Sequence, residues 1–163
     1  MTKRQYEKIT VPLRKHPHSI QVVKTLNKAA TILVYFAYPV LLLALALHHD
    51  VRLWKVLLTP AISFILVSIF RNSFNAPRPY EVLNIVPIIH KDTKGKSFPS
   101  RHVFSIFVIA MTFYYISMPM GICLMILGIM LALVRVIGGV HFPKDVIAGA
   151  IIGILSGVIG LYL

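Results

Sequence analysis

Long apolar runs alternate with short polar segments over most of the chain. The runs cover residues 29–47, 53–70, 103–117, 121–134 and 143–163. At about 1.5 Å per residue, a helix over the first run extends roughly 28 Å, which matches the hydrocarbon core of a bilayer. Because open backbone groups cannot face lipid, the pattern predicts an all-α, polytopic membrane helix bundle with about five transmembrane helices.

Glycines form a regular pattern in the last apolar run. Gly149, Gly153 and Gly157 recur every four residues and therefore share one face of a helix. Such a face of small residues lets a second helix approach closely in lipid. We expect the last helix to pack tightly against a neighbour along this face.

The composition agrees with the membrane class. Hydrophobic residues make up 57% of the chain and charged residues 13%, with a mean hydropathy of +0.78, whereas soluble domains average about 25% charged residues. Lys and Arg number 17 against 5 Asp and Glu. No basic helix or aromatic platform of a nucleic-acid-binding fold accompanies this charge, so we expect anionic lipid and an anionic substrate as partners, and no nucleic acid.

Metal and disulfide chemistry are not indicated. Cys123 is alone within an apolar run, which excludes a disulfide framework and a cysteine metal site. His48 and His49 are adjacent but lack a third ligand nearby, which favours a solvated turn. We therefore predict no metal ion and no other cofactor.

A polar, basic segment, residues 1–28, precedes the first apolar run and carries seven Lys and Arg among apolar residues. We expect Pro12 and Pro17 to break any long helix there, and a helix to start near Ile20. An interfacial segment on anionic headgroups and a basic tail both fit this pattern. The predicted division is a basic N-terminal interfacial segment over 1–28 and a membrane-embedded domain over 29–163.

Three polar clusters stand between the apolar runs: Arg71 to Pro79, Pro99 to His102, and Arg135 to Asp145. Counting spans from the N-terminus puts all three on the membrane side that also holds the N-terminus. Residues that are far apart in the sequence are thus expected at one face of the bundle. The pattern predicts a single site there.

Basic side chains in these clusters suit phosphate. A guanidinium is a permanent charge whose planar fork matches phosphate oxygens. Ser100 stands at the expected start of a helix, where backbone N–H groups attract anions. The predicted phosphate-binding residues are Arg71, Arg78, Ser100, Arg101 and Arg135. Taken alone, the first two arginines could equally mark a cytoplasmic loop.

Two histidines, His102 and His141, are the side chains of these clusters that exchange protons near neutral pH. Asp145 follows His141 by four residues in the first turn of a helix, so its carboxylate can reach back and fix the imidazole tautomer. We predict catalytic roles for all three. The alternatives are a structural helix-end histidine and a simple interfacial hydrogen bond.

Together the clusters resemble the motifs of the type 2 phosphatidic acid phosphatase superfamily, whose fold is shared with vanadium-dependent haloperoxidases. The family patterns read K-x6-R-P, P-S-G-H and S-R-x5-H-x3-D. Here they appear as Arg71-x6-Arg78-Pro79, Pro99-Ser100-Arg101-His102 and Val134-Arg135-x5-His141-x3-Asp145. Arg71 replaces Lys, Val134 replaces Ser and Arg101 replaces Gly. The family core usually has six spans, where we count five.

The resemblance implies metal-independent hydrolysis of a terminal phosphate on a lipid phosphate or diphosphate: phosphatidylglycerol phosphate, phosphatidate or undecaprenyl diphosphate. It implies that neutral His141 attacks phosphorus to form a phosphohistidine, that Asp145 orients His141, and that His102 protonates the leaving oxygen. Two alternatives stay open. One is a catalytically silent membrane phosphate-lipid binder or transporter, and the other is a haloperoxidase with bound vanadate.

The charge distribution also bears on orientation. Residues 1–28 carry seven Lys and Arg and residues 71–144 carry eight, whereas the opposite face carries only Arg52 and Lys55. Because Lys and Arg accumulate on the cytoplasmic side, we expect an integral membrane protein of a bacterial plasma membrane with its site in the cytoplasm. The pattern indicates no oligomeric state.

Overall fold

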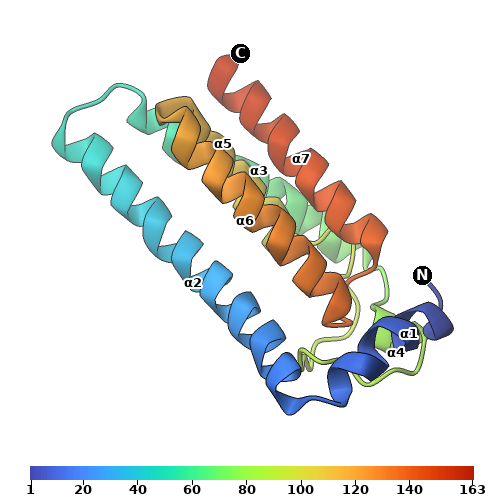
Figure 1. The fold of residues 1–163 in the computed structure, drawn as a ribbon. Coiled ribbons are helices and arrows are strands. Elements are labelled where there is room, and N and C mark those ends of the chain that lie inside the picture. Colours follow the sequence, from blue (N-terminus) through green and yellow to red (C-terminus); the bar gives the residue numbers. More distant parts are fainter.

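The fold is all-helical, as a computed structural model of residues 1–163 describes it. Long helices run alongside one another, and two short helices lie at one end of the bundle (Figure 1). In chain order the helices are α1 (Lys3–Arg14), α2 (Pro17–Leu47), α3 (Leu53–Phe74), α4 (Pro79–Val82), α5 (Arg101–Ile116), α6 (Met118–Ile137) and α7 (Pro143–Tyr162).

The predicted membrane bundle is confirmed. Helices α2, α3, α6 and α7 are long and apolar enough to cross a membrane, and α5 is a shorter apolar helix of 16 residues. At about 1.5 Å per residue α5 extends roughly 24 Å, slightly less than a typical hydrocarbon core. Except for Ser105, residues 103–113 of α5 are buried inside the bundle rather than exposed to lipid.

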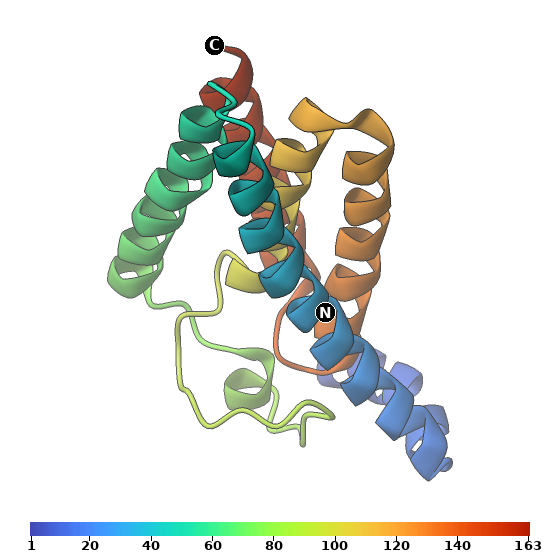
Figure 2. The ribbon, with the colours of Figure 1, turned by 90° about the vertical axis from the view of Figure 1, so that its left-hand side faces the viewer.

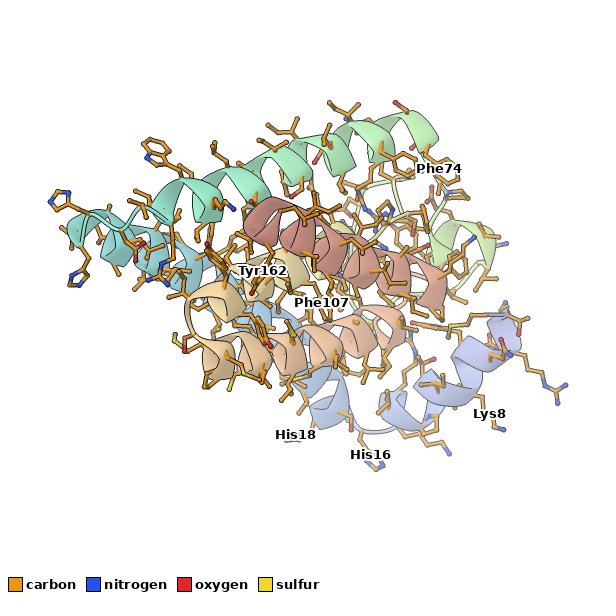
Figure 3. All side chains as sticks on the ribbon, turned by 90° about the horizontal axis from the view of Figure 1, so that it is seen from above. Lys8, His16, His18, Phe74, Phe107 and Tyr162 are labelled. Carbon is orange, nitrogen blue, oxygen red and sulfur yellow. The ribbon has the colours of Figure 1, made fainter.

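Helix α5 is the centre of the core, and Phe107 lies near the middle of the bundle when it is viewed from above (Figure 3). The glycine face of α7 packs directly against α5. A Cβ added at Gly149 would stand 2.7 Å from the Ser100 carbonyl oxygen, and one at Gly153 would stand 2.7 Å from the Phe104 carbonyl oxygen. The expected close approach of helices is therefore present.

The N-terminal segment differs from the expectation. Pro12 lies inside α1, and α2 begins at Pro17, three residues before Ile20. Proline suits a first helical position because its missing N–H is not needed there. Tyr6 of α1 is buried, and Pro12 stands near the last turn of that helix. The boundary expected after residue 28 consequently falls within the continuous helix α2.

The connection between α3 and α5, residues 75–100, is mostly irregular and lies with α4 at the bundle end that also holds α1 (Figures 1 and 2). Its apolar part is anchored there. Ile88 is buried in a cluster with Val23 and Val134, and the backbone N–H of Ile89 donates to the Gly138 carbonyl at 3.1 Å. The long polar connection is thus held against the turn that joins α6 to α7.

Candidate active site

A polar cavity of about 290 Å³ lies at the end of the bundle formed by this connection. None of its lining residues is hydrophobic, and none carries a carboxylate. The lining residues are Ser68, Arg71, Asn72, Arg78, Lys91, Thr93, Lys94, Lys96, Arg101, His102 and His141. The three polar clusters therefore meet at one cavity, and both histidines contribute to its wall.

Arg71 and Arg78 are buried and held by backbone carbonyls. Arg71 donates to the carbonyl oxygens of Lys96 and Pro99. Arg78 Nε donates to the Gly95 carbonyl at 2.9 Å, and its Nη1 donates to the Val140 carbonyl at 3.1 Å. These bonds tie the loop before α5 to the turn before His141. They also fix both guanidiniums at the cavity wall.

His141 lies in the turn between α6 and α7 and is 1% exposed. Gly139 permits this turn because its φ of +76° is unfavourable for other residues. Burial is the main cause that lowers the pKa of His141, and the charges of Arg135 and Arg78 lower it further. The imidazole is therefore neutral at pH 7, the form that has a free nitrogen lone pair.

Asp145 lies in the first turn of α7, and its Oδ2 is 3.6 Å from His141 Nδ1. This distance exceeds that of a direct hydrogen bond. The same oxygen accepts hydrogen bonds from the Ser97 hydroxyl at 2.6 Å and from the Phe142 backbone N–H at 2.9 Å. His141 and Asp145 are adjacent as predicted, but the Asp145 carboxylate accepts its hydrogen bonds from Ser97 and Phe142 instead.

Ser97 is a site residue that sequence reasoning missed. It is fully buried, and its hydroxyl lies 3.4 Å from His141 Nδ1 as well as 2.6 Å from Asp145 Oδ2. Its backbone N–H donates to the Ala76 carbonyl at 2.8 Å, which docks the loop. No spacing pattern marks this serine in the sequence, since only the folded loop brings it to the histidine.

The start of α5 carries three of the predicted residues. Ser100 is the N-cap as predicted, but its side chain makes no capping hydrogen bond and does not line the cavity. Its backbone N–H instead donates to the Asp145 carbonyl at 2.8 Å. Arg101 lines the cavity with its guanidinium 5.4 Å from the centre of the Phe64 ring. His102 is half-buried and lines the same cavity.

Arg135 does not line the cavity, although it was predicted with the other phosphate ligands. It is 3% exposed, and its Nη1 donates to Asn27 Oδ1 at 3.1 Å. Its Nε and Nη2 are buried and have no partner in the chain. Asn27 lies in the part of α2 that was expected to precede the bundle, so no sequence pattern connected it with Arg135.

Three further lysines of the loop, Lys91, Lys94 and Lys96, line the cavity and were not predicted as site residues. Burial lowers the pKa of Lys91 to about 7, with the nearby charges of Arg78 and Arg135 as further causes. The cavity is therefore strongly cationic, which suits an anion. No three metal-ligating side chains of the His, Cys, Asp and Glu types lie together in the chain.

The fold is that of an integral membrane helix bundle, and one end of it holds a cationic cavity with two histidines and a buried carboxylate beside one of them. The chain belongs to the PAP2 superfamily, whose family model matches residues 52–163. This confirms the resemblance that the three motifs indicated. The matched residues include every predicted site residue, whereas α1 and α2 precede them.

Two solved structures share this fold. Aquifex aeolicus LpxE has a TM-score of 0.75 and 26% sequence identity, over 98% of this chain and 94% of that one. The first transmembrane PAP2 type phosphatidylglycerolphosphate phosphatase from Bacillus subtilis has a TM-score of 0.70 and 16% identity, over 96% of this chain and 83% of that one. The second likeness, at that identity, shows the fold alone.

A curated relative matches a smaller region. The bacitracin transport permease protein BcrC of Bacillus licheniformis is 32% identical over 79 residues, which are 48% of this chain and 39% of that protein. The match thus spans well under half of that relative's length.

Proposed function

We propose that the protein is a membrane phosphatase that removes the terminal phosphate of a lipid phosphate or diphosphate through a phosphohistidine on His141. The observation that carries this proposal is the placement of a buried, neutral His141 in the wall of a cavity lined by Arg71, Arg78 and Arg101. Its Nδ1 faces Ser97 and Asp145, which leaves Nε2 as the nitrogen for attack.

The proposed reaction is a phosphoryl transfer in two steps. In the first, the Nε2 lone pair of His141 forms a bond to phosphorus while the bond from phosphorus to the leaving oxygen breaks, and His102 gives that oxygen a proton. In the second, water attacks the phosphohistidine, His102 takes a proton from the water, and inorganic phosphate leaves. An anion in the cavity favours the protonated form of His102 before the first step.

In the proposed reaction, negative charge on the phosphoryl oxygens is stabilised by fixed cations rather than by solvent. Arg71 and Arg78 are already held by carbonyl groups, so little reorganisation accompanies the reaction. Arg101 reaches the cavity from the start of α5. Arg135 and Ser100 do not line the cavity but have unpartnered donors, and in this proposal they complete the phosphate site by turning toward the bound phosphate.

A lipid substrate is supported by the apolar space next to the cavity. His102 also lines a small cavity of about 30 Å³ whose other residues include Ser105 and Ile109. Those two residues in turn line an apolar cavity of about 300 Å³ between α2, α3 and α5. A phosphate at His102 would therefore leave its lipid tail in the bilayer. The candidate substrates are phosphatidylglycerol phosphate, phosphatidate and undecaprenyl diphosphate.

A second candidate function is a silent phosphate-lipid binder or transporter. Arg101, where the family motif has Gly, favours it, because its guanidinium occupies part of the cavity wall. In that case the protein would bind phosphate or vanadate without releasing product. The name of the similar protein BcrC, a bacitracin transport permease protein, describes transport.

The test is phosphate release by the detergent-purified protein from a panel of the candidate lipids, with chelator present. We expect turnover by the wild type and none by His141→Ala. His48→Ala is the matched control, because this exposed histidine caps the end of α2 outside the cavity. Tight vanadate binding without turnover by the wild type would support the silent binder, and full activity of His141→Ala would remove the nucleophile assignment.

We further propose that the site faces the cytoplasm and that residues 1–28 act at the membrane surface. The bundle end with the cavity also holds α1 (Figure 1), whose Lys3, Arg4 and Lys8 are exposed. Lys8 points away from the bundle (Figure 3). Such a basic helix suits anionic headgroups, which are abundant on the cytoplasmic leaflet.

A further inference from the structure

Ser97 lies against both the proposed nucleophile and its carboxylate. Its hydroxyl oxygen is 2.6 Å from Asp145 Oδ2 and 3.4 Å from His141 Nδ1, whereas the direct distance from Oδ2 to Nδ1 is 3.6 Å. All three side chains are at most 1% exposed. Bulk water therefore does not compete for these groups.

The direction of the hydrogen bonds follows from the number of protons. A hydroxyl has one proton, and the short contact to an ionised carboxylate takes it. The oxygen of Ser97 can then only accept, so a hydrogen bond between it and Nδ1 of a neutral His141 requires the proton to be on Nδ1. That chain leads from His141 Nδ1–H to Ser97 Oγ–H and on to Asp145 Oδ2. It selects the tautomer in which Nε2 is unprotonated.

A purely structural role explains the hydroxyl less well. The loop is already docked by backbone bonds, from Ser97 N–H to the Ala76 carbonyl and from Ser100 N–H to the Asp145 carbonyl, each 2.8 Å long. Asp145 Oδ2 is also anchored by the Phe142 N–H at 2.9 Å. The Ser97 hydroxyl adds the one group that contacts both the carboxylate and the imidazole.

We propose that Ser97 is a positioning residue that connects Asp145 to His141 and sets the reactive tautomer, an inference that rests on the proposed phosphatase function. When Nε2 bonds to phosphorus and the leaving oxygen takes the proton of His102, positive charge develops on the imidazole. The Nδ1 proton stays in place and donates more strongly to Ser97, whose own bond to Asp145 strengthens in turn. No proton is lost along this chain.

The kinetic test is a double-mutant cycle of Ser97→Ala and Asp145→Asn on a lipid phosphate. We expect Ser97→Ala to lower kcat about 10- to 100-fold with little change in KM, the loss typical of one hydrogen bond to a charged group. In the Asp145→Asn background the same change should have a much smaller effect, because both residues act through one chain. The proposal would be overturned if the reductions in kcat caused by the two substitutions multiplied in the double variant. Full activity of Ser97→Ala would also overturn it.

A second measurement needs no turnover. Nitrogen-15 NMR of histidine-labelled protein in detergent should show His141 with a protonated Nδ1 in the wild type and a mixture of tautomers in Ser97→Ala. An unchanged tautomer would contradict the role of Ser97 even if kcat falls. A wild type that hydrolyses none of the lipids would instead contradict the proposed function, and the NMR result would still decide the role of Ser97.

Control variants separate this role from packing. Ser63→Ala removes a hydroxyl that bonds only to carbonyls of its own helix, at 2.6 Å to Thr59, and should leave kcat and the tautomer unchanged. If Ser97→Ala does not fold, Ser97→Cys keeps a side chain of similar shape with a weaker donor. Its kcat should then fall below that of the wild type, and wild-type kcat in Ser97→Cys would count against the proposal.

Discussion

The close contact between α7 and the start of α5 gives a sharp prediction for Gly149→Ala. The added Cβ would stand 2.7 Å from the Ser100 carbonyl oxygen and 3.2 Å from the Phe104 backbone nitrogen, where ordinary contacts are 3.4 Å or longer. Both opposing atoms are backbone and cannot rotate away. The helices must therefore separate locally by roughly 0.7 Å, which is the difference between the 2.7 Å contact and an ordinary contact of 3.4 Å.

The energetic result combines two opposing effects. Alanine in place of glycine stabilises a helix interior by about 1 kcal/mol. Overpacking costs about 1–3 kcal/mol, and the upper value applies because backbone atoms oppose the methyl group. We therefore expect a net loss of about 2 kcal/mol, which corresponds to a Tm lower by about 4–8 °C for a chain of this size.

The same displacement should reach the site, because Arg101 and His102 begin α5 and Ser100 is its N-cap. A shift approaching 1 Å in a catalytic group can cost about 100-fold in rate. We expect Gly149→Ala to reduce kcat by at least about 10-fold at temperatures where it remains folded. Thermal unfolding in detergent and phosphate release measure the two effects. Ser156→Ala, a small change on the same helix, is the control, and a Gly149→Ala protein as stable and active as wild type would refute the packing argument.

Two further predictions concern charge. Burial lowers the pKa of Lys91 to about 7, so Lys91 is cationic below that pH and loses its charge as pH rises through it. We therefore expect kcat/KM for a lipid phosphate to fall across this pH range. Lys91→Met should flatten the fall without altering the substrate's own titration. An identical pH profile in the variant would exclude Lys91 from phosphate binding. The orientation of the protein in the membrane can be tested with an impermeant thiol reagent applied outside intact cells. It should label His49→Cys but not Lys3→Cys, each in a Cys123→Ser background. The reverse labelling would put the cavity outside the cell.

The spans and the glycine face could be predicted because each depends on residues close together in the chain. Apolar length determines whether a helix can cross a bilayer, and a four-residue repeat determines a helical face. The start of α2 also depends on residues close together in the chain, but it was predicted incorrectly. Pro17 was interpreted as a helix breaker, whereas its position at the first turn makes it a good first residue.

Residues contributed by the irregular loop could not be predicted. Ser97 reaches His141, and Lys91 reaches the cavity, because Arg71 and Arg78 bind carbonyls of the loop before α5 and because Ile88 packs against α2 and α6. Those contacts join positions that are far apart in the sequence and follow no period. Asn27 was missed for the same reason, since its partner Arg135 is 108 positions away along the chain.

The unpartnered donors of Arg135 and Ser100 give a physical reason to expect an anion beside them. Six buried side-chain atoms have no partner in the chain; three of them are donors of Ser100 and Arg135, whereas the Asp145 Oδ1 among them is an acceptor. Each such group costs about 1–3 kcal/mol, so a fold under selection for stability alone would satisfy or remove them. The two unpartnered N–H groups of Arg135, near guanidiniums already fixed by carbonyls, would gain most from phosphate oxygens. In the proposed reaction these donors would contribute to binding the charge that develops during phosphoryl transfer.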